Sequence, residues 1–136
     1  CPFAAHIRKV NPRSDVDDPA LGSMIRAGIP YGPEVSDGEK ASNSSSTEAS
    51  LERGLAFVSY QSHINKGFAF VQHTWANDPN FFNGFPNGIS TGLDPIIGVR
   101  IGTDKFNITG TDPSDPSKPL TIIQNFVVSR GGEYFF

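Results

Sequence analysis

Apolar residues repeat at helical intervals in two parts of the chain. Near the N-terminus, Phe3, Ile7 and Val10 are spaced as i, i+4 and i+7, which predicts a short one-sided helix over residues 2–10. A longer repeat over residues 64–76 predicts a second amphipathic helix. Each repeat ends at a proline-containing polar sequence, which is typical of the end of a helix.

Other segments contain the β-branched and aromatic residues that favour strands. The clearest is residues 55–61, and an extended segment is predicted over residues 24–31. Two more strands are predicted near the C-terminus, over residues 120–131 and 133–136, around a glycine pair. Helices and strands mixed in this order predict an α+β fold with an antiparallel sheet.

The length of 136 residues suits a single domain. Its 14 glycines and 11 prolines imply many turns. Residues 36–50 are rich in Ser, Asn, Glu and Lys and have no aromatic residue, so we expect a mobile polar loop there.

Several classes of protein are disfavoured. A net charge of −3 supplies no basic surface for nucleic acid, and the longest apolar run is too short to span a membrane. The single cysteine, Cys1, could form a disulfide only with another chain. No phosphate-binding loop, zinc pattern or Gly-x-Ser-x-Gly motif occurs, and His63 and His73 are interpreted as structural or surface residues.

Four motifs occur in one order along the chain. They are Cys1-Pro-Phe-Ala-Ala-His-Ile-Arg-Lys, Ile25-Arg-Ala-Gly-Ile-Pro-Tyr-Gly, Gly54-Leu-Ala-Phe-Val-Ser-Tyr-Gln and Arg130-Gly-Gly-Glu-Tyr-Phe-Phe. Together they resemble the C-terminal part of a fungal dye-decolorizing peroxidase. The resemblance implies a ferredoxin-like α+β unit, heme b as cofactor, hydrogen peroxide as oxidant and bulky dyes or phenolic compounds as aromatic reducing substrates.

On the proximal side of the heme, the resemblance makes His6 the iron ligand. The small side chains of Ala4 and Ala5 beside it would let a flat ligand approach closely. The resemblance makes Asp94 the acceptor for the second ring nitrogen of His6 and directs Arg8 towards a heme propionate. The alternatives are a satisfied helix histidine, an ordinary Asp-Pro turn and a solvated arginine.

On the distal side, the resemblance places Arg26, whose guanidinium stays charged and can stabilise a developing anion. It also places Leu55 and Phe57 there, on one face of the predicted strand. An arginine beside a turn can instead be a surface cation, and for the two apolar residues pocket wall and core are the same interpretation.

Electron transfer from a buried heme to bulky substrates needs an oxidisable side chain near the surface. Trp75 and Tyr31 match positions where members of the family have such residues. For Trp75, core packing on the helix is the competing interpretation.

The family's distal aspartate, in a Gly-x-x-Asp-Gly motif, has no counterpart in this chain. The first strand and helix of the ferredoxin-like unit would also precede Cys1. We therefore expect either an N-terminal companion chain from the same precursor, or a stand-alone remnant. The resemblance further implies an extracellular, secreted protein, and Asn43 and Asn107 lie in glycosylation sequons.

A second function from another class is a secreted, non-enzymatic module that binds carbohydrate or another surface. Aromatic side chains can stack on sugars, and this interpretation expects four of them to be exposed: Trp75, Phe81, Phe82 and Phe85.

Overall fold

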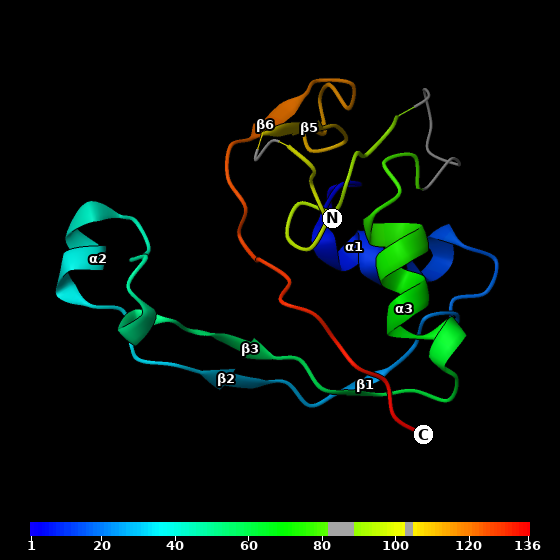
Figure 1. Ribbon diagram of the computed structural model, residues 1–136. Coiled ribbons are helices and arrows are strands. Elements are labelled where there is room, and N and C mark those ends of the chain that lie inside the picture. The colour runs from blue at the N-terminus through cyan, green and yellow to red at the C-terminus, as the bar shows by residue number, and fades with distance from the viewer. Residues whose placement is uncertain (82–88, 103–104) are drawn as a thin grey trace. The chain divides into compact units, whose positions relative to one another are not determined.

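The computed structural model describes residues 1–81, 89–102 and 105–136, which divide into two compact units (Figure 1). The first unit consists of Cys1–Ser23 and Gln61–Phe136, and the second of Met24–Tyr60. Phe82 and Phe85 lie outside the described residues. Within the described residues, no helix has both the length and the apolar character needed to cross a membrane.

Both predicted helices form in the first unit. The first is α1 (His6–Val10). The second begins as a 3₁₀ turn (Ile64–Lys66), continues as α3 (Phe68–Phe70) and ends as a π-helical turn, η4 (Val71–Ala76). Its last turn closes with a bond from the Asn77 N–H to the Gln72 carbonyl, the i to i+5 pattern of a π-helix. Helix α1 packs against this π-helical turn.

The face of α1 that is buried is not the one that its apolar spacing predicted. Ile7 is 62 % exposed, whereas Ala4 just before the helix and Lys9 within it are buried. The spacing of apolar residues predicted the wrong buried face because the helix packs through a small side chain and through a lysine whose charge is hydrogen-bonded inside the unit.

Trp75 lies at the centre of the apolar packing of the first unit. It is 4 % exposed, meets the edge of Phe70 and stacks on Phe81, with both pairs of ring centroids 5.2 Å apart. Gly22 closes this packing: its φ is +79°, and a Cβ there would lie 2.9 Å from the Trp75 ring. Only glycine tolerates both that backbone conformation and that close approach.

The predicted C-terminal strands form only in part, over the first three residues of the segment 120–131. The only strand among the described residues after 109 is β6 (Leu120–Ile122), which pairs antiparallel with β5 (Phe106–Ile108), a strand that we did not predict. Residues 123–136 form no strand pair around the two glycines. Their apolar side chains therefore had no partner strand in this unit, and Phe135 and Phe136 are exposed.

The second unit is a pair of short antiparallel ladders (Figure 1). Strand β1 (Ile25–Arg26) pairs with β4 (Ser59–Tyr60), and β2 (Ile29–Tyr31) pairs with β3 (Gly54–Ala56). The predicted extended segments are thus confirmed, each interrupted once. All buried hydrophobic residues of the described chain belong to the first unit, so this one presents its apolar side chains outward.

Part of the segment expected as a polar loop is helical. Helix α2 (Asp37–Ser42) begins with a capping box, in which the side chains of Ser36 and Glu39 each accept a bond from the other's backbone N–H. Both carboxylate oxygens of Glu39 also accept bonds of 2.9 Å from Arg53. The Ser-x-x-Glu spacing was a readable helix signal that the polar composition obscured.

We predict that acid weakens the second unit through Glu39. The Arg53 guanidinium, with backbone N–H groups of Ser46 and Ser36, holds the pKa of Glu39 well below its usual range. A lowered folded-state pKa adds stability above the ordinary glutamate pKa of about 4.3, and this stability is lost as the pH falls through the folded-state value. Thermal unfolding at pH 7 and pH 3 should show a smaller acid loss in Glu39→Gln than in the parent. Exposed Glu48→Gln is the control, and equal acid losses in all three proteins would contradict the prediction.

Candidate functional site

The structure brings His6 and Asp94 together across 88 positions of sequence. His6 Nδ1 lies 3.0 Å from Asp94 Oδ1 and 2.9 Å from Asp94 Oδ2. The Asp94 side chain is fully buried, and the His6 side chain is 32 % exposed. The predicted contact between these residues is therefore present in the structure.

Local structure fixes Asp94 where His6 can reach it. The Asp94 N–H donates to the carbonyl of Ala76 at the end of the π-helical turn, at 2.9 Å. Its own carbonyl accepts from the Gly98 N–H, which closes a turn over residues 94–98. Asp-Pro therefore does make a turn, and this turn directs the carboxylate towards the start of α1.

The surroundings of the Asp94 carboxylate favour its ionised form. Burial alone would raise its pKa, but hydrogen bonds from His6 and from the backbone N–H groups of Ile97 and Ile96 favour the charged form, and the net effect lowers the pKa. An ionised carboxylate can only accept hydrogen bonds. His6 Nδ1 must therefore be the donor.

This arrangement determines what the other ring nitrogen of His6 can do. When Nδ1 carries the proton of a neutral imidazole, Nε2 has a free electron pair. No hydrogen bond to Nε2 occurs within the described residues. Metal-binding histidines are commonly oriented in this way, by a carboxylate on the nitrogen that does not bind the metal.

Sequence reasoning missed two buried polar residues of this region, Lys9 and Thr91. Lys9 is on α1 and contacts Thr91 and Gly92, which precede Asp94 closely in the chain. No pattern in the sequence distinguishes Lys9 from a solvated lysine, and Thr91 lies in a segment that we expected to be irregular.

Arg8 has an acidic partner in this structure. Its Nε and Nη2 bind the two carboxylate oxygens of Asp15 at 2.6 and 2.9 Å, and its guanidinium lies 4.4 Å from the ring centroid of Phe3. These contacts orient the side chain. The role of Arg8 at a heme propionate stays a prediction.

The two aromatic candidates for electron transfer differ in their environment. Trp75 is buried, as its core-packing interpretation requires. Tyr31 is 47 % exposed, and its ring lies over Gly54, its partner across the β2–β3 ladder. The role of each residue as a radical site stays a prediction.

The three predicted distal residues all belong to the second unit. Arg26 is on β1, with an exposed side chain that makes no hydrogen bond or ion pair within the described residues. Leu55 on β3 is 57 % exposed, and Phe57 directly after β3 is 41 % exposed. His6 and Asp94 belong to the first unit, so the distal assignment stays a prediction.

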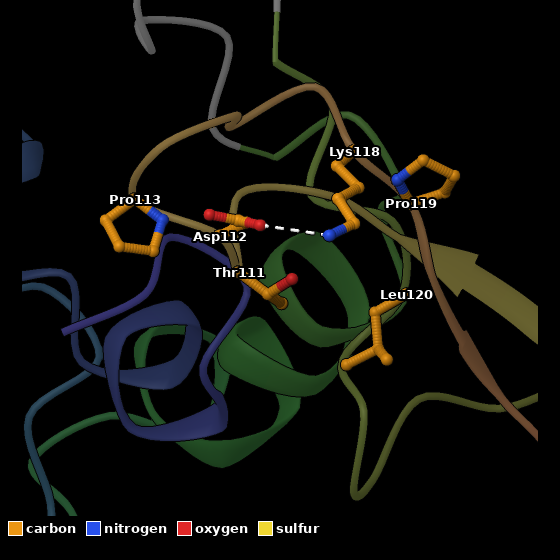
Figure 2. A pocket seen from close by; sticks show the side chains of 6 residues that line it. All are labelled: Thr111, Asp112, Pro113, Lys118, Pro119 and Leu120. Carbon is orange, nitrogen blue, oxygen red and sulfur yellow. Dashed lines mark hydrogen bonds and ion pairs between the residues drawn. The ribbon is translucent and has the colours of Figure 1, made fainter.

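A separate surface hollow of about 320 Å³ lies beside β6 (Figure 2). Asp112 and Lys118 form an ion pair of 3.2 Å across it, and its remaining lining is Thr111, Pro113, Pro119 and Leu120. It shares no residue with the His6–Asp94 pair.

The aromatic platform expected for a carbohydrate-binding module is not formed by the described residues. Trp75 is buried, and Phe81 is partly buried and stacks on it. The other two aromatic residues named for that platform, Phe82 and Phe85, lie outside the described residues. The exposure of Trp75 that the alternative function expected is therefore wrong.

Fold and site together define a small α+β protein in which a buried carboxylate orients a histidine with an open Nε2. The family model described as "Dyp-type peroxidase, C-terminal" matches residues 1–92. The chain belongs to this family, and its fold is the ferredoxin-like α+β fold of that C-terminal domain.

Fungal proteins are similar over the whole chain. Peroxidase 2 of Mycetinis scorodonius is 54% identical over 143 residues, and a dye-decolorizing peroxidase of Exidia glandulosa is 55% identical over 136 residues. This chain spans 28% and 25% of their lengths, respectively. The crystal structure of a decolorizing peroxidase from Auricularia auricula-judae matches 97% of this chain with a TM-score of 0.82 and 46% identity, and the chain covers 30% of that protein.

We predict that neutral His6 is a single tautomer with its proton on Nδ1, because Asp94 offers only acceptors at that nitrogen. The nitrogen-15 chemical shifts of the ring, measured by NMR in protein free of metal, report the tautomer directly. His73, which is exposed, serves as the reference ring. A His6 signal with the proton mainly on Nε2 would contradict this prediction.

Proposed function

We propose that this chain is the heme-binding part of a dye-decolorizing peroxidase, which reduces hydrogen peroxide and oxidises bulky dyes and phenolic compounds. The His6–Asp94 pair is the observation that carries the proposal. The names of the similar fungal proteins support the activity, although the chain spans less than a third of their length.

The residues at the pair fit a heme. Nε2 of His6 is open, and Ala5 next to it is small and only partly buried. Apolar side chains of the second unit, among them Leu55 and Phe57, are exposed and could line a heme face. Heme, when bound, would supply the iron that reacts with peroxide and then accepts electrons from the reducing substrate.

Asp94 would tune the histidine ligand. A carboxylate that accepts the Nδ1 proton gives the imidazole anionic character and makes it a stronger electron donor at Nε2. The two backbone N–H groups on Asp94 Oδ1 keep the carboxylate from rotating away. His6 would therefore hold a fixed ring orientation as well as an increased basicity.

Arg26 would act on the peroxide side. Its guanidinium donates from a planar, permanently charged group, which suits the anion that develops as the O–O bond breaks. Leu55 and Phe57 would exclude water from the same side and so strengthen this interaction. Arg8 would contribute at a heme propionate in addition to its bond with Asp15.

The distal acid would come from outside this chain, from an N-terminal companion chain of the same precursor. The amount of uncovered apolar surface supports such a partner. In the second unit alone the exposed large hydrophobic side chains are those of Ile25, Ile29, Tyr31, Val35, Leu55, Phe57, Val58 and Tyr60. Apolar surface on this scale marks a site that another molecule covers.

Reducing substrates too large to reach a heme would be oxidised through Tyr31 or Trp75. The exposure of Tyr31 favours it over buried Trp75 as the surface site of oxidation. We also propose that the protein is secreted, and the exposed positions of Asn43 and Asn107 in their sequons support this.

We predict that the full-length protein purified from its native source shows a Soret band and that His6→Ala loses it or shifts it away from the histidine-bound form. The matched control is His73→Ala, which removes an exposed histidine of the π-helical turn and should leave the band unchanged. A colourless, iron-free parent, or an unchanged spectrum in His6→Ala, would overturn the proposal.

We predict that Arg26→Leu retains heme but reacts more slowly with hydrogen peroxide. Loss of one preorganised donor at a developing anion typically costs ~10²–10³ in rate. Stopped-flow mixing with peroxide, before any reducing substrate is added, measures this step. Arg26→Lys keeps the charge without the planar fork, so its rate of reaction with peroxide should lie between those of the parent and of Arg26→Leu.

If Arg26→Leu reacts with peroxide at the rate of the parent, Arg26 does not act on the distal side. The parent itself should be checked by mass spectrometry for a companion chain that contains Gly-x-x-Asp-Gly. A slow parent without that chain would mean that the acid is missing, and the Arg26 comparison would then be made after the companion chain is added.

A further inference from the structure

A buried lysine lies one helical turn after the proposed iron ligand. Lys9 is 3 % exposed, and its Nζ contacts four oxygen atoms. They are the carbonyl oxygens of Gly92, Asp78 and Phe81 at 2.6, 2.8 and 3.0 Å, and Thr91 Oγ1 at 3.3 Å. An ammonium group has three protons, so this set of acceptors saturates it.

These contacts compensate for an unfavourable location. Burial lowers the pKa of Lys9 to about 8, although the nearby charges of Asp94 and Asp78 act in the opposite direction. Lysine is almost never fully buried unless its charge is paired or hydrogen-bonded. The oxygen atoms around Nζ are thus held together by one cation, and they would be left without this donor if it were removed.

The position of Lys9 on α1 places these contacts close to His6. His6 and Lys9 are three residues apart, so their side chains lie on neighbouring parts of the helix surface. His6 binds Asp94, and Lys9 binds Thr91 and Gly92, which lie three and two residues before it. One turn of helix is therefore tied at two points to the same four-residue segment, 91–94.

A third contact closes the arrangement. Buried Thr91 donates from Oγ1 to the Phe81 carbonyl at 2.7 Å, and that carbonyl also accepts from Lys9. Helix α1 has five residues and no side-chain cap, so by itself it would be marginal. Its orientation relative to Asp94 must come from such tertiary contacts.

We propose that Lys9 is a positioning residue for the His6–Asp94 pair: it fixes segment 91–94 against α1, so that the Asp94 carboxylate stays in hydrogen-bonding range of His6 Nδ1. The expected effect of Lys9 on the reduction potential of the iron rests on the proposed function. The expected effect on the tautomer of His6 does not depend on it.

Positioning and simple charge predict opposite results at a heme. Removing a nearby positive charge stabilises the oxidised, more positive iron and lowers the reduction potential. Loosening the bond from His6 to Asp94 reduces the anionic character of the ligand and raises the potential. The sign of the change in Lys9→Met therefore separates the two roles, and a merely structural role would move neither the potential nor the tautomer.

The experiment measures the reduction potential of the full-length heme-bound protein. Lys9→Met should raise it, and Lys66→Met, at an exposed lysine of the same unit, should leave it unchanged. In an Asp94→Asn background, where the carboxylate is already absent, Lys9→Met should no longer raise it. Lys9→Arg, which keeps the charge and the donors, should restore part of the parent value.

If Lys9→Met fails to fold, Thr91→Val provides the second test. It removes one acceptor of Lys9 and one donor to Phe81 with little change in volume and none in charge. A raised potential in Thr91→Val supports positioning. An unchanged or lowered potential in whichever variant folds would overturn it.

The same variants are compared by NMR in protein without heme. Lys9→Met, or Thr91→Val in its place, should convert His6 from one Nδ1-protonated tautomer to a mixture. If the parent binds no heme but the tautomer responds, the proposed function fails and the role of Lys9 stands. If the parent binds heme and the potential does not rise in the variant, the role of Lys9 alone fails.

Discussion

The rest of the first unit depends on one requirement: a fully buried, ionised carboxylate must be surrounded by donors. Asp94 obtains two from the backbone of its own turn and one from His6. The backbone donors come from sequence neighbours, so they form wherever the turn forms. The bond to His6 requires helix α1 to meet a turn 88 positions further along the chain, and this bond is what makes the turn part of a site.

The packing around that bond explains why it can persist. The π-helical turn bonds to the backbone of Asp94 through the Ala76 carbonyl, while Lys9 ties α1 to segment 91–94. Trp75, on the same turn, fills the interior between Gly22 and Phe81. Polar and apolar contacts therefore hold the same few segments together. The loss of either kind of contact would alter the position of His6 relative to Asp94.

Sequence predicted those features that depend on local pattern or on a close family likeness. The helices at 2–10 and 64–76 have an apolar repeat, and His6 and Asp94 were paired by resemblance. Lys9 could not be identified, because burial of a lysine depends on carbonyl groups that only the folded chain assembles. The predicted strand pair over residues 123–136 does not form for a related reason: β propensity describes a suitable surface and does not supply the partner strand.

The second unit shows how polar contacts can hold a structure whose apolar side chains stay outside. Its ladders are short and its Arg53–Glu39 pair is only partly buried, whereas Leu55 and Phe57 remain exposed. A ribbon of this kind gains little from its own hydrophobic burial. Any molecule that covers its apolar face binds the folded form preferentially and therefore stabilises it. A heme or a companion chain would thus contribute to folding as well as to chemistry. The exposed apolar side chains, which are unfavourable in isolation, are the ones that such a molecule would cover.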